Sequence, residues 1–196
     1  MDGEGLSHFH VYAACFCEQG DLLSQWRGYA NGGGVAIGFD TRLLQQVSKG
    51  PTGVEQVRLQ KALYGRASAR PHLDSLVAKL TESVAGFPGA TAETRFGESV
   101  LPVLARIKHP GFAEENEWRL TLASQAEQVV DFRGGSLGLV PFVKFDLPPR
   151  AIVSVRIGPS RDLELRMQAA RRLKQKYNHL FAEGAEILSS GIPFRS

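Results

Sequence analysis

Segments with strand-like and helix-like patterns are grouped along this chain instead of alternating strictly, and this grouping limits the fold more than any other feature. Apolar residues recur at helical spacing through a central section, 68–107. Runs typical of strands lie on both sides of it, at 10–17, 35–39, 54–64, 118–123, 128–132, 138–145, 152–157 and 186–189. This order favours an α+β fold with a mostly antiparallel sheet and flanking helices.

Shorter helices are expected at 21–30, with Asp21 near the N-cap, and at 40–47, with Asp40 as the cap. A basic amphipathic helix is expected at 161–179. Its apolar stripe consists of Leu163, Met167, Ala170, Leu173 and Tyr177. Its polar face carries Arg166, Arg171, Arg172, Lys174 and Lys176. Such a face is most often a solvated surface, although it could also meet an acidic protein or nucleic acid.

The 196 residues are enough for one domain, 1–196, with the helical section inserted between strands. A net charge of +3 mildly favours an anionic partner but lacks the clustered charge of a nucleic-acid-binding protein. No apolar run approaches the roughly 18 residues of a membrane span, and the polar N-terminus does not resemble a secretory signal. Together with only two cysteines, these features predict a cytoplasmic protein.

The stretch Glu114 to Leu120 reads Glu-Glu-Asn-Glu-Trp-Arg-Leu and is the main candidate for chemistry. Glu115 and Glu117 are two positions apart at the head of an expected strand, so both can point to one face. Like charges that close should raise one pKa, which suits one carboxylate that grips a hydroxyl and one that steadies positive charge. The alternative is an exposed strand edge with Glu117 paired to an arginine. Arg119 or Arg27 is expected to pair with a buried carboxylate.

Trp26 and Tyr29 are three residues apart and therefore share one helical face. Such a pair usually packs into the core, but it can also form the floor of a pocket for a flat ring. Trp26 and Trp118 are both expected to be largely buried. His8 and His10 share a strand face without a third ligand at a recognisable spacing, so no metal site is expected.

Several motifs together carry a family resemblance. They are Cys15-Phe-Cys-Glu18, Leu23-Ser-Gln-Trp-Arg-Gly-Tyr-Ala30, Gly34-Val-Ala-Ile-Gly-Phe-Asp40, Lys108, Phe112-Ala-Glu-Glu-Asn-Glu-Trp-Arg119, Ile157-Gly-Pro159 and Ile192-Pro-Phe-Arg195. Their order and spacing resemble the bacterial domain of unknown function 2971 family. That family is in turn similar to the ADP-ribosyltransferase superfamily, whose split sheet would then be expected here.

The second resemblance implies NAD as a substrate and a toxin or phage-defence role. It implies that Glu117 binds the nicotinamide ribose and that Glu115 orients or deprotonates the acceptor. Cys17 stands where related sequences usually have Ser, and His8 or His10 would replace an N-terminal motif that is otherwise lost. The predicted nucleotide-binding residues are Trp26, Arg27, Tyr29, Cys17, His10 and Arg119. A non-catalytic nucleotide-sensing or partner-binding module of the same fold is the alternative.

Overall fold

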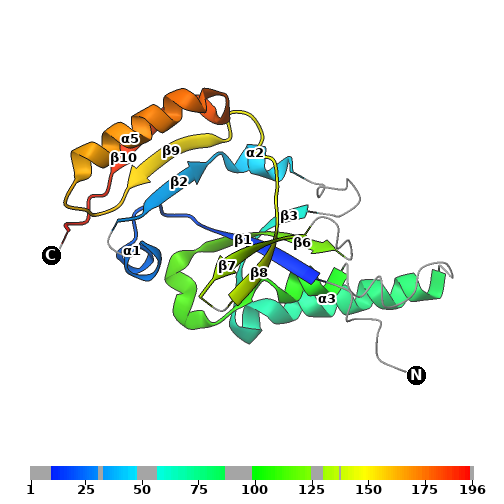
Figure 1. Ribbon diagram of the computed structural model, residues 1–196. Helices are drawn as coiled ribbons and strands as arrows, with labels where there is room; N and C mark the ends of the chain where they lie inside the picture. Colours follow the sequence, from blue (N-terminus) through cyan, green and yellow to red (C-terminus); the bar gives the residue numbers. More distant parts are fainter. Residues whose placement is uncertain are drawn as a thin grey trace. The chain divides into compact units, whose positions relative to one another are not determined.

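The computed structural model describes residues 10–30, 33–47, 57–86, 99–124, 130–136 and 138–194 (Figure 1). It has the predicted α+β class, with several helices and small sheets in which antiparallel pairing dominates. The chain divides into two compact units. The first contains Met1–Phe16 and Ser48–Phe145, and the second contains Cys17–Val47 and Asp146–Ser196.

A three-stranded sheet of order β1-β6-β3 forms the centre of the first unit. Its strands are β1 (His10–Cys17), β6 (Glu117–Ser124) and β3 (Val57–Lys61). β3 runs antiparallel to β6, with Lys61 opposite Trp118 and Gln60 opposite Arg119. Leu120 and Leu122 of β6 are buried on the side of the strand away from Arg119. The opposite face of β6 carries Glu117, Arg119 and Thr121, and Glu117 and Thr121 are buried as well.

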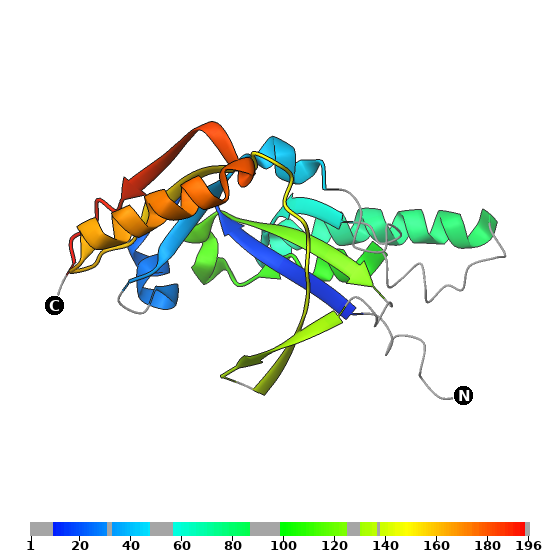
Figure 2. The same ribbon diagram turned by 45° about the horizontal axis from the view of Figure 1, so that its top comes forward.

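A second, smaller pairing flanks this sheet and leads into the helices. β4 (Leu63–Tyr64) runs parallel to β5 (Ile107–Lys108). The long helix α3 (Gly65–Gly86) starts directly after β4, and residues 99–104 are also helical. A 3₁₀ helix, η1 (Pro110–Glu115), joins β5 to β6. β7 (Val130–Gly135) and β8 (Gly138–Val143) form an antiparallel two-stranded ribbon (Figure 2).

The second unit is built on a sheet of order β10-β9-β2. β10 (Phe181–Ser189) is parallel to β9 (Ile152–Ile157), and β2 (Val35–Phe39) is antiparallel to it. Helix α5 (Leu163–Lys176) packs on β9 and β10. The core between them consists of Ile152, Val155, Ile157, Ala170, Phe181 and Ala185. α1 (Leu23–Tyr29), α2 (Thr41–Gln45) and the 3₁₀ helix η3 (Asn178–Leu180) complete the unit.

Most predicted segments are present, with bounds that differ by a few residues. The strand predicted at 54–64 is divided at Ala62 into β3 and β4, and residues 54–56 lie outside the described part. The break predicted at 87–89 between two helices also lies outside it. Asp40 caps α2 as predicted, since its carboxylate accepts from the Arg42 backbone N–H at 2.9 Å. Asp21 does not cap α1, because its carboxylate binds other groups that are described below.

The apolar stripe predicted for the basic helix is only partly correct. Ala170 is buried and Met167 packs against the core, whereas Leu163, Leu173 and Tyr177 are exposed. No described helix is long and apolar enough to cross a membrane. The prediction of one domain depends on how the two units are joined, and it stays a prediction.

Candidate functional site

A tight turn at the head of β6 brings Glu115 and Glu117 together. η1 begins after His109, whose ring nitrogen Nδ1 accepts from the Gly111 backbone N–H at 3.1 Å. The 3₁₀ helix ends at Asn116, which has the left-handed conformation with φ 41° and ψ 52°. Asn adopts this conformation more readily than most residues. The two carboxylates thus converge through a turn, and not through the strand alternation that the sequence predicts.

Glu117 is a buried carboxylate held by donors from several elements. Only 2% of its surface is exposed. Its Oε1 accepts from the Arg119 Nε at 2.5 Å, and its Oε2 accepts from the Lys108 ammonium. The Cys15 thiol also donates to it. Its backbone N–H donates to the Tyr64 hydroxyl at 2.8 Å. The side chain and the backbone of this residue are therefore both fixed.

These contacts set the protonation states of the site. Burial by itself would raise the pKa of Glu117, but the hydrogen bonds from Arg119, Cys15 and Lys108 outweigh it and lower that pKa to about 2. The thiol of Cys15 is partly desolvated and donates to the carboxylate, and both effects raise its pKa to about 11. At neutral pH the site therefore holds an ionised Glu117 beside a protonated thiol.

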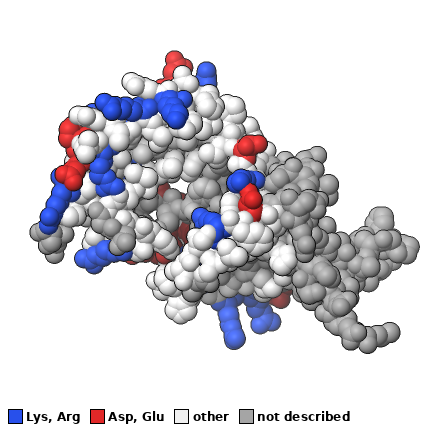
Figure 3. Space-filling model, viewed as in Figure 1, with Lys and Arg blue, Asp and Glu red and all other residues white. Residues whose placement is uncertain are grey.

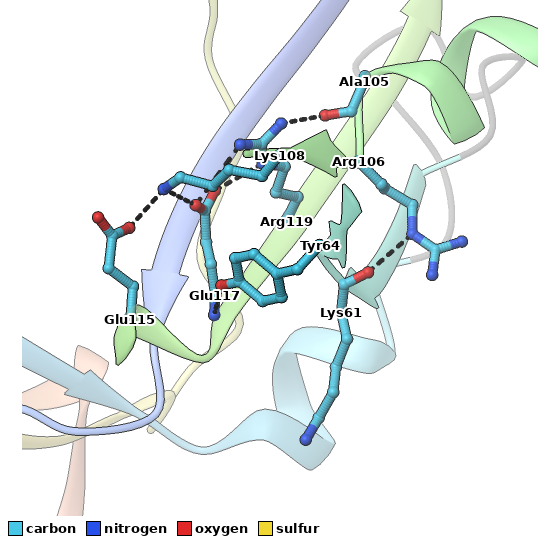
Figure 4. A network of polar contacts seen from close by, with 8 residues as sticks. All are labelled: Lys61, Tyr64, Ala105, Arg106, Lys108, Glu115, Glu117 and Arg119. Atoms are coloured by element: carbon cyan, nitrogen blue, oxygen red, sulfur yellow. Dashed lines mark hydrogen bonds and ion pairs between the residues drawn. The ribbon is translucent and has the colours of Figure 1, made fainter. Parts of the chain in front are cut away.

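Lys108 lies between the two carboxylates, and its ammonium contacts both Glu115 and Glu117 (Figure 4). Burial would lower its pKa, but the two carboxylates reverse this and raise it. The repulsion expected between Glu115 and Glu117 is offset by this shared cation. The pKa of Glu117 consequently falls and does not rise.

Arg119 confirms the prediction that an arginine of this region pairs with a buried carboxylate. Besides its contacts with Glu117, its Nη1 donates to the Ala105 carbonyl. The pair shields Glu117 and connects β6 to the chain before β5. Arg106 is nearby and also buried, and its Nε donates to the Lys61 carbonyl at 2.9 Å (Figure 4). Arg27, the other arginine considered, lies in α1 of the second unit and is exposed.

Trp26 and Tyr29 occupy different environments despite their spacing. Trp26 is 9% exposed, and its Nε1 donates to the Asp21 carboxylate at 2.7 Å. Its ring lies so close to Gly158 that a Cβ there would be 2.9 Å from it. Trp26 therefore packs into the core, which was one of the two roles considered for the Trp26–Tyr29 pair. Tyr29 is 80% exposed. Trp118 is only partly buried, with the Lys61 ammonium 5.3 Å from its ring centroid.

The remaining predicted residues mark the ends of β1. His10 is its exposed first residue, and Cys17 is its partly buried last residue. The cysteine that contacts Glu117 is Cys15, two positions before Cys17. His8 lies outside the described residues. Neither cysteine forms a disulfide bond in the described part of the chain.

Three members of this cluster were given no role from the sequence, namely Lys108, Tyr64 and Cys15. Lys108 belongs to the motifs that carry the family resemblance, but nothing in its spacing indicates a contact with Glu117. Tyr64 is 53 residues from Glu117 and reaches it because β3 and β4 lie between β6 and β5. Chain topology creates these contacts, so local patterns could not predict them.

Comparison with known families supports the first resemblance. Residues 25–120 match the family described as protein of unknown function, DUF2971. The matched region begins within α1 and contains β2 and the whole turn from Lys108 to Arg119. No curated protein and no solved structure matches the chain.

Proposed function

We propose that the cluster around Glu117 is the reaction centre of an ADP-ribosyltransferase or NAD glycohydrolase that acts in the cytoplasm as a toxin or phage-defence effector. The observation that carries the proposal is the fixed, ionised carboxylate of Glu117. The split sheet of the superfamily and its use of NAD belong to the same proposal.

The chemistry needs a negative charge at a defined place. Cleavage of the nicotinamide–ribose bond builds positive charge on the ribose, and a carboxylate facing it stabilises the transition state more than the ground state. Glu117 is suited to this because Arg119 and the Tyr64 hydroxyl hold it in one orientation before any ligand arrives. Its charge is also effective because little water surrounds it.

Glu115 and Lys108 would divide the remaining tasks. Glu115 is more exposed than Glu117 and shares the Lys108 ammonium with it. A ligand that approaches Glu117 from the side of Glu115 would displace this ammonium, which the flexible lysine side chain allows. Glu115 would then be available to orient or deprotonate an acceptor. Tyr29 belongs to the second unit and has an exposed ring, and its stacking on nicotinamide or adenine stays a prediction from the sequence.

One observation favours a second candidate, a non-catalytic nucleotide-sensing or partner-binding module. The charge of Glu117 is already neutralised within the protein, by Arg119 and Lys108. Structural ion-pair networks also perturb pKa values, so such a cluster can stabilise a fold without performing chemistry.

The test is nicotinamide release from NAD by the wild-type chain and by Glu117→Gln, Glu115→Gln and Glu114→Gln. Glu114 is an exposed neighbour and serves as the matched control. We expect Glu117→Gln to abolish release and Glu115→Gln to reduce transfer to an acceptor more than hydrolysis. Glu114→Gln should behave like the wild type.

The outcomes separate the two candidates. Release that survives Glu117→Gln would remove Glu117 from the mechanism. A folded wild-type chain that binds NAD in a thermal-shift assay without releasing nicotinamide would be a sensing module. If the folded chain neither binds nor cleaves NAD, the partner-binding role is the candidate that remains.

A further inference from the structure

An apolar groove lies between α5 and β2, entirely within the second unit. Its volume is about 530 Å³. Its walls include Val35 and Ile37 of β2, Val155 and Ile157 of β9, and Leu173 and Tyr177, which lie at the C-terminal end of α5. It shares no residue with the cluster around Glu117.

The groove exists because α5 covers only part of the sheet. The helix packs on β9 and β10, whereas β2 is the edge strand of the order β10-β9-β2. Val35 and Ile37 are consequently 54% and 46% exposed. Ala169 and Ala170 are the small residues of α5 on this side, so the helix leaves space above β2. A surface with this many exposed apolar side chains gains free energy when a ligand covers it.

Arg166 is the charged residue among those that line the groove, which it contacts mainly with its apolar stem. No described residue supplies a counter-charge to it. The structure gives its guanidinium no hydrogen bond or ion pair with any described residue. It lies directly over Gly33, where an added Cβ would be 2.4 Å from its Nη1. Figure 3 shows both Lys and Arg side chains and Asp and Glu side chains on the surface around α5. A partly buried, unpaired guanidinium is a ready partner for a carboxylate or phosphate.

We propose that this groove binds a small amphipathic anion, with an apolar acyl or aromatic body on β2 and α5 and an anionic head on Arg166. The volume lies within the roughly 300–1,000 Å³ of small-molecule sites, which are mostly apolar with a few polar groups that orient the ligand. The proposal is independent of the NAD chemistry of the first unit.

The experiment measures binding of decanoate and of decanol by calorimetry, with the wild type and three variants. Arg166→Gln removes the head-group partner, and Ala169→Phe fills the groove from an exposed position of α5. Arg172→Gln is the matched control, because it removes an exposed charge of the same helix from outside the groove. Circular dichroism and the melting temperature of each variant establish that it is folded.

We expect the wild type and Arg172→Gln to bind decanoate more tightly than decanol. Arg166→Gln should weaken decanoate binding by about tenfold or more and leave decanol binding unchanged, since a charge-assisted hydrogen bond is lost. Ala169→Phe should weaken both ligands. If Ala169→Phe does not fold, the affinities of Arg166→Gln for decanoate and for decanol still test the proposal.

Three results would overturn the proposal. Decanoate could fail to bind the wild type, or it could bind Arg166→Gln as tightly as the wild type. Sedimentation could also show a dimer of the chain that Ala169→Phe dissociates, which would make the groove an interface between two copies.

Discussion

Glu117 is buried, and the groups that donate hydrogen bonds to its carboxylate belong to separate strands. A buried charge that loses one partner costs more than a surface charge does, because water cannot replace the lost contact. The consequences of this burial can be measured at Arg119 and at Glu117 itself.

Arg119→Met should lower the free energy of unfolding by about 3–5 kcal/mol, the usual cost of removing one partner of a buried ion pair. The control is Arg42→Met, which removes the exposed pair with Asp40 at 2.8 Å and should change stability little. Urea unfolding of both variants provides the comparison. An unchanged midpoint for Arg119→Met would mean that Lys108 alone compensates the charge of Glu117.

The contribution of Glu117 to stability should depend on pH with a definite sign. Its pKa is lowered from 4.5 to about 2 in the folded protein, so the folded state favours the ionised form. The stabilisation is complete above pH 4.5 and is lost as the pH falls toward 2. The stability difference between the wild type and Glu117→Gln should therefore narrow from pH 7 to pH 3. A constant difference would contradict the lowered pKa.

At the scale of elements, the position of α1 depends on a glycine in the loop after β9. The ring of Trp26 in α1 lies against Gly158, and the Asp21 carboxylate also accepts from the Ser190 hydroxyl at 2.5 Å and from the Gly191 backbone N–H at 2.8 Å. The start of α1 thus contacts the segment after β9 and the segment after β10.

Gly158→Ala should destabilise the protein by about 1–3 kcal/mol, because the added methyl group overpacks against a buried ring that cannot move away easily. Gly28→Ala is the matched control in α1. A Cβ there meets nothing within 4 Å, and replacing a helical glycine should stabilise the protein by about 0.5–1 kcal/mol. The melting temperature should fall for Gly158→Ala and rise for Gly28→Ala. Equal changes in the two variants would contradict the close packing of Trp26 against Gly158.

The sequence predicts elements well where a local pattern determines them. β1, β2 and β9 have the predicted bounds because short apolar runs end at turn residues. η1 and β5 were not predicted, since a 3₁₀ turn with a left-handed Asn116 and a two-residue strand leave no periodic signal. The ion pair of Glu117 with Arg119 was predictable because the two residues are two positions apart in one strand and share a face. The contacts of Glu117 with Lys108 and Tyr64 were not predictable, because they join different elements.

At the scale of the whole molecule, the chain passes from one unit to the other after Phe16, Val47 and Phe145. The second unit therefore depends on two distant segments. β2 comes from the first of them and its partner β9 comes from the second. Neither segment holds the complete sheet.

A fragment of residues 1–145 should consequently lack an ordered β2. Without β9, the backbone of Val35 to Phe39 loses its antiparallel partner, and an isolated strand is not stable in water. Amide resonances of residues 35–39 in a ¹H–¹⁵N spectrum should be poorly dispersed and should recover when a 146–196 fragment is added. Well-dispersed resonances in the isolated fragment would show that β2 folds without β9.

The lysine shared by Glu115 and Glu117 has a consequence for sequence variation among relatives. Loss of the ammonium alone would leave two carboxylates close together with one guanidinium, and loss of either carboxylate alone would leave an excess of positive charge. Positions 108, 115 and 117 should therefore change together in evolution. A relative with a neutral residue at position 108 should also have lost one of the two acids, and its remaining acid identifies the carboxylate that function requires.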